Sequence, residues 1–423
     1  MDRLINIIRP YPWGSRTALP ELLGTAPTGE PRAELWMGAH PGAPSAVDRG
    51  DGPQSLNVLI DADPEGELGD ATVRRFGPTL PFLLKILAAG EPLSLQVHPD
   101  LARARAGFAD EEARGIPLDA PDRNYKDANH KPELICALDE FIGLCGFRAP
   151  VGTALLLDAL AVPFLVPLAA TLREKPEQDA LREVLTTVLT ADPDTVAVAV
   201  RQTGEALERA AKSVEAGDTG DDPALSLLPA SLQSFLGCYA EVCRAYPEDP
   251  GAIAALLLND VRLQPGEALY LGAGVPHAYL SGLGVEILAN SDNVLRCGLT
   301  PKHVDIPELL RVVEFSSREP GVLRPAPVPD SDGEELYPAP IDEFRLSRFT
   351  LGGTAPQSRS VPGAAPQILL CTEGTAVLTD ADGSSITLQR GESSFVPAGG
   401  PALRVGSADA GTRTAVFRAT VSV

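Results

Sequence analysis

The sequence contains few cysteines and no long apolar run. Its six cysteines form no Cys-x-x-Cys pair, and no apolar leader segment opens the chain, so we expect reduced thiols and a cytoplasmic location. A membrane-spanning helix needs roughly 20 consecutive apolar residues. No run in this sequence approaches that length, and we therefore expect no membrane partner.

Positive charge is also scarce. The chain has 35 Lys and Arg residues against 57 Asp and Glu residues, which gives a formal charge of −22. Nucleic acids and anionic membranes repel so acidic a protein, and we expect neither as a partner. An anionic small molecule would have to bind in a local pocket where basic side chains gather.

The chain, at 423 residues, is longer than a usual single domain, so we expect two or three domains. Short apolar segments separated by Gly and Pro predict strands in the first and last parts of the chain. Residues 150–256 differ, because Leu181, Val184, Leu185 and Val188 recur at helical spacing. This middle part has no histidine and no Gly-rich phosphate loop. We expect a helical insertion with a structural role, with a lid as the alternative.

An internal repeat, offset by 125 residues, lies within the strand-rich parts. Residues 263–279 and 388–402 share Leu, Gln, Gly, Glu, Gly and Pro at matching positions. The second copy has Ala402 where the first has His277, so we expect one site per chain. Short strands with a Pro-Gly turn and a late Gly-x-Pro-His turn are typical of cupins, small double-sheet jelly rolls whose barrel mouth holds a metal.

We therefore predict a mainly β fold with a helical insertion, built from two cupin-like jelly-roll barrels and an α-helical domain. The expected catalytic cupin comprises residues 1–149 and 257–325, separated by the helical domain at 150–256. A C-terminal cupin-like domain without a metal site is expected over 326–423. The Pro-rich segment 324–340 is expected to link the two barrels.

One chemically active segment covers residues 94–100. In a strand, alternate side chains share a face, so Ser94, Gln96 and His98 are expected to point the same way. Asp100 is expected to cap the helix that follows.

A second active segment runs from Tyr125 to Glu133 and places two lysines, a histidine and a carboxylate around Pro132. Proline excludes ordinary helix here and favours a strand edge or a bulge. The same alternation puts Lys131 and Glu133 on one side and His130 on the other.

These segments supply a set of metal ligands. Two imidazoles, a carboxylate and an amide oxygen arrive from separate strands as His98, His277, Glu133 and Gln96. Zinc accepts such nitrogen and oxygen ligands and keeps an open position in catalytic sites, so we predict one Zn²⁺ per chain. Two His and one carboxylate also suit the Fe(II) of cupin dioxygenases, which is the alternative enzyme class. A sugar-phosphate sensor without catalysis is the third alternative.

Two charged residues near the start of the chain are further pocket candidates. Lys85 lies inside an apolar run, where a lysine is rarely buried without a partner. The alternative for Lys85 is an edge position from which its ammonium reaches water. Glu34, close to Trp36, is the second candidate.

The motifs resemble those of a known family, the type I phosphomannose isomerases, which interconvert mannose 6-phosphate and fructose 6-phosphate. Residues 125–133 match the family's first signature in full, and its second signature runs from His277 to Lys302. The departures visible here are Leu288 in place of Met and Cys297 in place of Ala, and neither carries a ligand or a charge. The resemblance implies a zinc-dependent aldose-ketose isomerase that moves a proton through a cis-enediolate, with a catalytic cupin, a helical domain and a C-terminal cupin.

The resemblance also gives roles to the polar residues of both signatures. Lys131 has an alternative role, in which it only pairs with the substrate phosphate or with Glu133. The expected partner is a small sugar phosphate, and we expect a monomer. The candidates for catalysis are Arg296, Lys131, Glu286, His130 and Asp292, and those for binding the substrate or its phosphate are Ser94, Lys85, Lys302 and Glu34.

Overall fold

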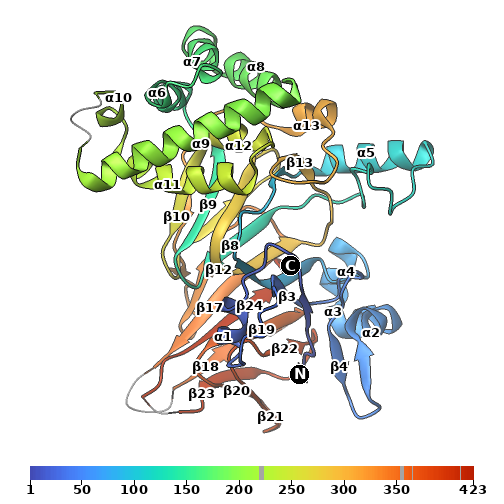
Figure 1. Ribbon diagram of the computed structural model, residues 1–423. Coiled ribbons are helices and arrows are strands. Elements are labelled where there is room, and N and C mark those ends of the chain that lie inside the picture. Colours follow the sequence, from blue (N-terminus) through green and yellow to red (C-terminus); the bar gives the residue numbers. More distant parts are fainter. Residues whose placement is uncertain (219–222, 353–356, 364, 410) are drawn as a thin grey trace.

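The computed structural model describes residues 1–218, 223–352, 357–363, 365–409 and 411–423. It is a sheet-rich fold in which most helices gather at one end and the C-terminal strands at the other (Figure 1). Within the described residues, no helix is both long and apolar enough to cross a bilayer.

The largest sheet holds the strands that carry most of the polar candidates. Its main path pairs seven strands, in the order β14 (Val322–Leu323), β11 (Ala268–Leu271), β8 (Glu133–Ala137), β12 (His277–Ala289), β6 (Phe82–Ala89), β3 (Glu34–Met37) and β2 (Ile7–Arg9). All eight residues of β6 are buried, as expected for its continuous apolar run. The long β12 therefore lies between two strands that bring side chains to the site.

Four further strands extend this sheet from the first half of β12. They are β7 (Leu95–Val97), β9 (Phe141–Phe147), β10 (Leu258–Leu263) and β13 (Leu295–Gly298). The strands β6 and β7 follow each other in sequence, but they pair with different parts of β12 and not with each other. Among the described residues, the paired strands do not close into a ring.

Short helices and a hairpin cover the N-terminal part. Asp100 accepts a hydrogen bond from the backbone N–H of Arg103 at 2.7 Å, which confirms the expected cap of the next helix. The elements are α1 (Ala18–Leu22), β4 (Ala46–Asp48), β5 (Pro53–Ser55), α2 (Leu56–Ala62), α3 (Pro64–Leu68), α4 (Asp70–Phe76) and α5 (Leu101–Ala113).

Helices occupy the middle of the chain, as predicted. The apolar stripe that includes Leu181 and Val188 is buried on α8 (Glu177–Leu189). The remaining elements are α6 (Pro150–Leu160), α7 (Leu165–Glu174), α9 (Pro193–Ala216), α10 (Pro223–Ser226), α11 (Ala230–Ala245), α12 (Gly251–Ala254) and the 3₁₀ turn η2 (Ala255–Leu257). A last helix, α13 (Ile306–Val312), follows the second signature.

The C-terminal part forms two sheets. One pairs β1 (Asp2–Arg3), β22 (Ser393–Val396), β19 (Gln367–Glu373), β24 (Thr414–Thr420), β17 (Arg345–Leu351), β16 (Glu334–Tyr337) and β15 (Ala326–Pro327) in that order. The other pairs β18 (Ser358–Val361), β23 (Leu403–Ser407), β20 (Ala376–Asp380) and β21 (Ser385–Leu388). The segment predicted to be a linker thus contributes strands β15 and β16 to the first of these sheets.

The 125-residue repeat is visible in the backbone. Gly266 and Gly391 have φ of 88° and 79°, and Gly274 and Gly399 have φ of 77° and 74°. These left-handed turns need glycine, which explains why the repeat retained it. The copies differ at the site position, because His277 is buried whereas Ala402 is exposed.

A shared apolar core joins the largest sheet to the C-terminal sheet. It includes Cys136 and Val285 from the first and Ile368 and Phe417 from the second, each at most 3% exposed. The N-terminal strand β1 adds a second connection, because Asp2 pairs with Phe395 of β22. No pattern in the sequence indicated that this first strand would join the last sheet.

Candidate active site

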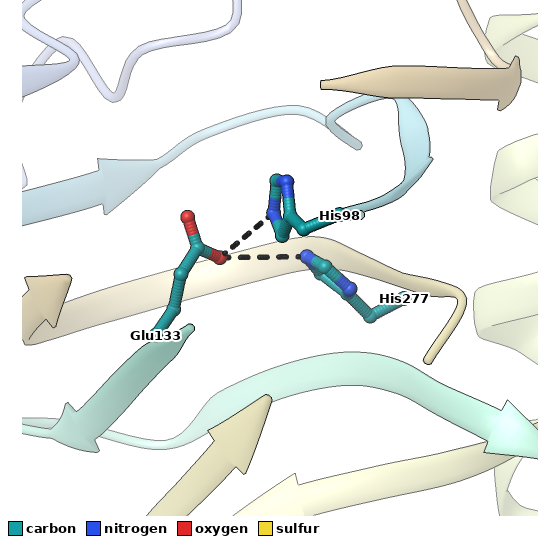
Figure 2. Close-up of side chains that lie close together, drawn as sticks. All are labelled: His98, Glu133 and His277. Carbon is teal, nitrogen blue, oxygen red and sulfur yellow. Dashed lines mark ion pairs between the residues drawn. The ribbon is translucent and has the colours of Figure 1, made fainter. Parts of the chain in front are cut away.

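Two histidines and a glutamate meet at the ends of three strands. His98 follows β7, Glu133 begins β8 and His277 begins β12. Oε2 of Glu133 lies 3.4 Å from Nε2 of His98 and 3.5 Å from Nε2 of His277 (Figure 2). All three side chains are at most 2% exposed.

The two imidazole rings are fixed so that their free nitrogens face the carboxylate. Nδ1 of His98 donates to the carbonyl oxygen of Asn293 at 2.8 Å, and Nδ1 of His277 donates to that of Val275 at 2.9 Å. A carbonyl oxygen only accepts, so the hydrogen is on Nδ1 and the lone pair on Nε2 in each neutral ring. Burial lowers the pKa of His98 to about 4, which keeps this ring neutral at physiological pH.

The trio fits a metal ion. Nε2 of both histidines and Oε2 of Glu133 are buried and have no hydrogen-bond partner among the residues that the structure describes. Their ligand atoms all lie within 4.8 Å of one another. Leaving three such atoms unsatisfied is costly, and a cation that accepts two imidazoles and a carboxylate removes the cost. Such a donor set suits zinc.

Gln96, the fourth predicted ligand, lies beside the trio. Its Cα pairs with that of His277 across β7 and β12 and with that of Arg296 across β7 and β13. Gln96 lines a cavity of about 460 Å³, and Glu133 is the member of the trio that lines it too.

Lys131 pairs with the free oxygen of the glutamate. Its Nζ lies 2.7 Å from Oε1 of Glu133, which confirms that the two side chains share a side. Burial opposes charge on Glu133, but the ammonium of Lys131 outweighs burial and holds the pKa of this carboxyl well below its usual range. Glu133 is therefore an anion that can bind a metal through Oε2.

A buried network of alternating charges forms another wall of the cavity. Nζ of Lys85 lies 3.4 Å from Glu34 and 3.5 Å from Glu286, so this lysine has the partners that its burial requires. Glu34 also accepts from Nε1 of Trp36 at 2.7 Å, and Glu286 accepts from Oη of Tyr279 at 2.9 Å. All five side chains line the cavity.

Glu286 is a carboxyl of this network whose proton can be moved near neutral pH. Burial and the negative charge of Glu133 raise its pKa to about 7, although Lys85 opposes the rise. At neutral pH, a carboxyl with this pKa exists in both protonation states. This property suits a group that takes up and returns a proton.

Cations gather at another part of the cavity. Arg296 on β13, together with Ser94 and Lys302, lines it. Burial lowers the pKa of Arg296, and burial together with the charge of Arg296 lowers the pKa of Lys302. Neither cation has an ion-pair partner within the part of the chain that the structure describes. An anionic group of a ligand would relieve their repulsion.

Two of the predicted catalytic residues lie in less favourable places. Nε2 of His130 is 2.6 Å from Oε1 of Glu343, and His130 does not line the cavity. Asp292 lines the cavity, but its side chain is 56% exposed and Oδ2 lies 3.3 Å from Nε2 of His40. The structure thus places ten of the thirteen predicted residues on the cavity wall; His98 and His277 are buried at the metal centre, and His130 lies apart.

The sequence did not single out Asn293 or Tyr246. Asn293 was visible only as one letter of the second signature, although its carbonyl orients His98. Tyr246 lines the cavity from the end of α11, in the part expected to be structural. A helical spacing pattern carries no signal for a residue just beyond the helix end, so sequence reasoning could not find it.

Comparisons with known proteins agree with this arrangement. Residues 1–150 match the family model for the catalytic domain of type I phosphomannose isomerase. The mannose-6-phosphate isomerase of Salmonella typhimurium is 42% identical over 405 residues, which cover 94% of this chain and 95% of that protein. The human mannose-6-phosphate isomerase is 31% identical, with 92% of each chain covered.

Solved structures give the same result. A crystal structure of the Salmonella typhimurium mannose 6-phosphate isomerase, bound to its substrate f6p and to zinc, matches with a TM-score of 0.85. Its sequence identity is 37%, and the match covers 100% of both chains.

Proposed function

The chain belongs to the family of type I phosphomannose isomerases, and we propose that it interconverts mannose 6-phosphate and fructose 6-phosphate in a zinc-dependent reaction. The observation that carries this function is the convergence of three buried ligand atoms beside a cavity with two cations, none of which has a partner within the described part of the chain. A metal held by these ligand atoms and the two cations can thus contact one small phosphorylated molecule. The iron dioxygenase alternative is not favoured, because the relatives at 41–42% identity are isomerases.

The metal would be held by His98, Glu133 and His277, and we keep Gln96 as the fourth ligand. When bound, zinc supplies a Lewis acid that polarises the carbonyl and hydroxyl oxygens of the open-chain sugar. The pairing of Lys131 with Oε1 leaves Oε2 of Glu133 directed at both imidazoles.

We assign the proton transfer between C2 and C1 to Glu286. Its carboxyl lines the cavity with a pKa of about 7, and Tyr279 and Lys85 hold it in place. Lys131 is a weaker candidate, because its ammonium is ion-paired with Glu133 and offers no lone pair. His130 is not retained, since it bonds to Glu343 away from the cavity.

Arg296, Lys302 and Ser94 are proposed to bind the phosphate, with Arg296 near enough to the metal ligands to stabilise enediolate charge as well. The antiparallel register supports this division. Arg296 pairs with Gln96, two residues from His98, and Gly298 pairs with Leu95, next to Ser94. The strand rise of about 3.3 Å per residue places Ser94 about 13 Å from His98 along the chain. Ser94 and Lys302 thus define a phosphate end, and His98 marks the metal end.

We also propose the domain division expected from the sequence: a cupin-like catalytic domain from 1–149 and 257–325, a helical domain at 150–256 and a cupin-like domain at 326–423. The matching turns of the 125-residue repeat support duplication of one ancestral fold. In this division, the N-terminal domain contributes strand β1 to the sheet of the C-terminal domain, where it pairs with β22.

All six thiols are free, which supports a reducing, cytoplasmic setting. A monomer stays part of the proposal.

A coupled assay tests this function directly. Purified protein with its measured zinc content should convert fructose 6-phosphate to mannose 6-phosphate, and the reverse. A protein that binds the sugar phosphate without converting it would be the sensor, and a protein that consumes O₂ with bound iron would be the dioxygenase.

A further inference from the structure

The turn from Tyr246 to Gly251 connects the helical insertion to the sheets beside the phosphate end of the cavity. It follows α11 and leads into α12. Tyr246 lines the cavity, as do Thr300 and Lys302 from the loop after β13. Two hydrogen bonds and one close backbone contact join this turn to the walls of the cavity.

Asp249 holds the loop that carries Lys302. Its Oδ2 accepts from the backbone N–H of Thr300 at 2.9 Å, and its Oδ1 accepts from that of Gly251 at 2.7 Å. Oγ1 of Thr300 accepts in turn from the backbone N–H of Lys302 at 3.1 Å. Thr300 therefore connects the carboxylate of Asp249 to the backbone of Lys302, a cation of the phosphate end.

The backbones of the turn and the loop are in direct contact. A Cβ atom on Gly298 would come within 2.4 Å of Cα of Gly251, and one on Gly251 would come within 2.6 Å of the backbone N of Leu299. Leu299 is 1% exposed and has φ of 56°, a left-handed conformation that disfavours a branched side chain. A residue in such a conformation persists only where its surroundings hold it, and here the surroundings include Gly251 and Asp249.

Tyr246 contacts a second segment of the cavity wall. Its Oη donates to the carbonyl oxygen of Pro92 at 2.8 Å. Pro92 comes two residues before Ser94, the hydroxyl that we place at the phosphate end. The same turn thus contacts the segment before β7 and the loop after β13.

We propose that this turn is the positioning element of the phosphate end, with Asp249 and Tyr246 setting the separation between Ser94 and Lys302. The inference rests on the proposed function for the identity of the anion. Neither residue touches the reacting carbons in this assignment, so they are positioning residues. The helical insertion then determines how tightly a phosphorylated sugar binds.

The test compares Asp249→Asn with wild type in the full-length, zinc-loaded protein. The Asn side chain has one carboxamide oxygen for the two backbone N–H donors, so it can accept only one of the two hydrogen bonds. Its NH₂ group then faces the other N–H, and two donors repel each other. We expect KM for mannose 6-phosphate and the inhibition constant of inorganic phosphate to rise together, about tenfold, because a lost charge-assisted hydrogen bond has roughly this effect. We expect kcat to change less than about threefold, and zinc content to stay at the wild-type level.

The matched control is Asp192→Ala, because asparagine caps a helix as well as aspartate does and only alanine removes the cap. Asp192 caps α9 by accepting from the backbone N–H of Thr195 at 3.1 Å, in the same helical part. This variant should lower Tm by a similar amount but leave KM and phosphate inhibition unchanged. A purely structural role for Asp249 would make the two variants alike, and phosphate constants within twofold of wild type in Asp249→Asn would overturn the proposal.

A second variant covers the case in which Asp249→Asn does not fold. Tyr246→Phe removes only one hydroxyl and should raise both constants about threefold; unchanged constants in this variant would also contradict the proposal. Calorimetric titration with inorganic phosphate gives the same comparison without turnover. If wild type showed no isomerase activity but bound phosphate more tightly than both variants, the proposed function would fail and the positioning role would stand.

Discussion

The carbonyl oxygen of Asn293 accepts a hydrogen bond from Nδ1 of His98 at 2.8 Å, and thereby fixes the ring that faces the metal position. The side chain of the same asparagine binds the first signature. Its Oδ1 accepts from the backbone N–H of Lys126 at 2.7 Å, and its Nδ2 donates to the carbonyl oxygens of Asp127 and Asn129 at 2.8 Å each. One buried residue therefore connects both signatures to a metal ligand.

Replacing this side chain should loosen the metal centre. In Asn293→Ala, the backbone carbonyl stays, but the hydrogen bonds of the side-chain amide that hold this carbonyl in place are lost. We expect zinc affinity to fall about 10- to 100-fold, the usual effect of losing a group that orients a ligand. Competition with a chelator of known zinc affinity measures the change. Asn57→Ala on α2 is the control, because Asn57 makes no hydrogen bond to either signature within the described residues. Equal zinc affinities in the two variants would exclude the orienting role of Asn293.

Removing zinc should abolish isomerisation but leave the sheets folded. The strands β6 and β12 are largely buried among apolar residues and do not need the metal to pair. Zinc return should restore activity and, at a thousandfold excess over Kd, add about 4 kcal/mol to the free energy of unfolding. Circular dichroism and activity should be followed together. Glu133→Gln should resemble the metal-free protein, and full activity in a verified metal-free sample would exclude a catalytic role for zinc.

The rate should depend on the ionisation of Glu286. As pH rises through the pKa of this carboxyl, the basic form accumulates, so kcat/KM should rise and reach a plateau. Burial and the negative charge of Glu133 raise this pKa to about 7 in the metal-free protein, and bound zinc offsets that charge. The inflection of the zinc enzyme should therefore lie at or below about 7.

Glu286→Gln should remove that inflection and lower kcat about 10²- to 10⁴-fold. The control is Glu67→Gln, which neutralises another buried carboxylate, paired with Arg49 outside the cavity. It should retain the wild-type pH profile. An unchanged inflection in Glu286→Gln would transfer the role of base to another group.

Arg296→Lys should lower turnover more than it lowers zinc content or stability. Lysine keeps the charge but loses the planar fork that can contact two oxygens at once. We expect kcat to fall at least about tenfold, the effect of losing one charge-assisted hydrogen bond. Near-normal turnover would show that Arg296 acts only as a distant counter-ion.

Lys302→Ala should instead act on binding. A single ammonium attracts phosphate without aligning the reacting carbons, so KM should rise while kcat changes little. Added salt should weaken substrate binding less in the variant than in wild type, because the screened charge is gone. A kcat defect as large as that of Arg296→Lys would contradict this division of roles.

The sequence predicted which side chains of the site share a side, although the expected strand begins only at Glu133, as β8, and His130, Lys131 and Pro132 precede it. Lys131 and Glu133 share a side, and His130 points elsewhere, as the spacing around Pro132 required. The partner of His130 could not be predicted in the same way. Glu343 lies 213 residues away, and only the packing of the C-terminal part brings it there.

Long-range pairing accounts for most of what the sequence did not reveal. The repeat predicted two related sheet regions, but not that Cys136 and Phe417 would belong to one core. Spacing likewise predicted helices in the middle of the chain but not the contacts of Asp249, whose acceptors face a loop 51 residues ahead. Local patterns fix elements and faces, whereas contacts between distant loops depend on the complete fold.

The pairing of β1 with β22 constrains the order in which the protein can be completed. Residues 2 and 3 leave the ribosome long before their partners Ser394 and Phe395. Strand β1 must therefore wait until β22 has been made before the two strands can pair. Meanwhile, the N-terminal segment is anchored through β2, which pairs with β3 of the largest sheet. The start of the chain is thus held close to the place where its partner strand will arrive.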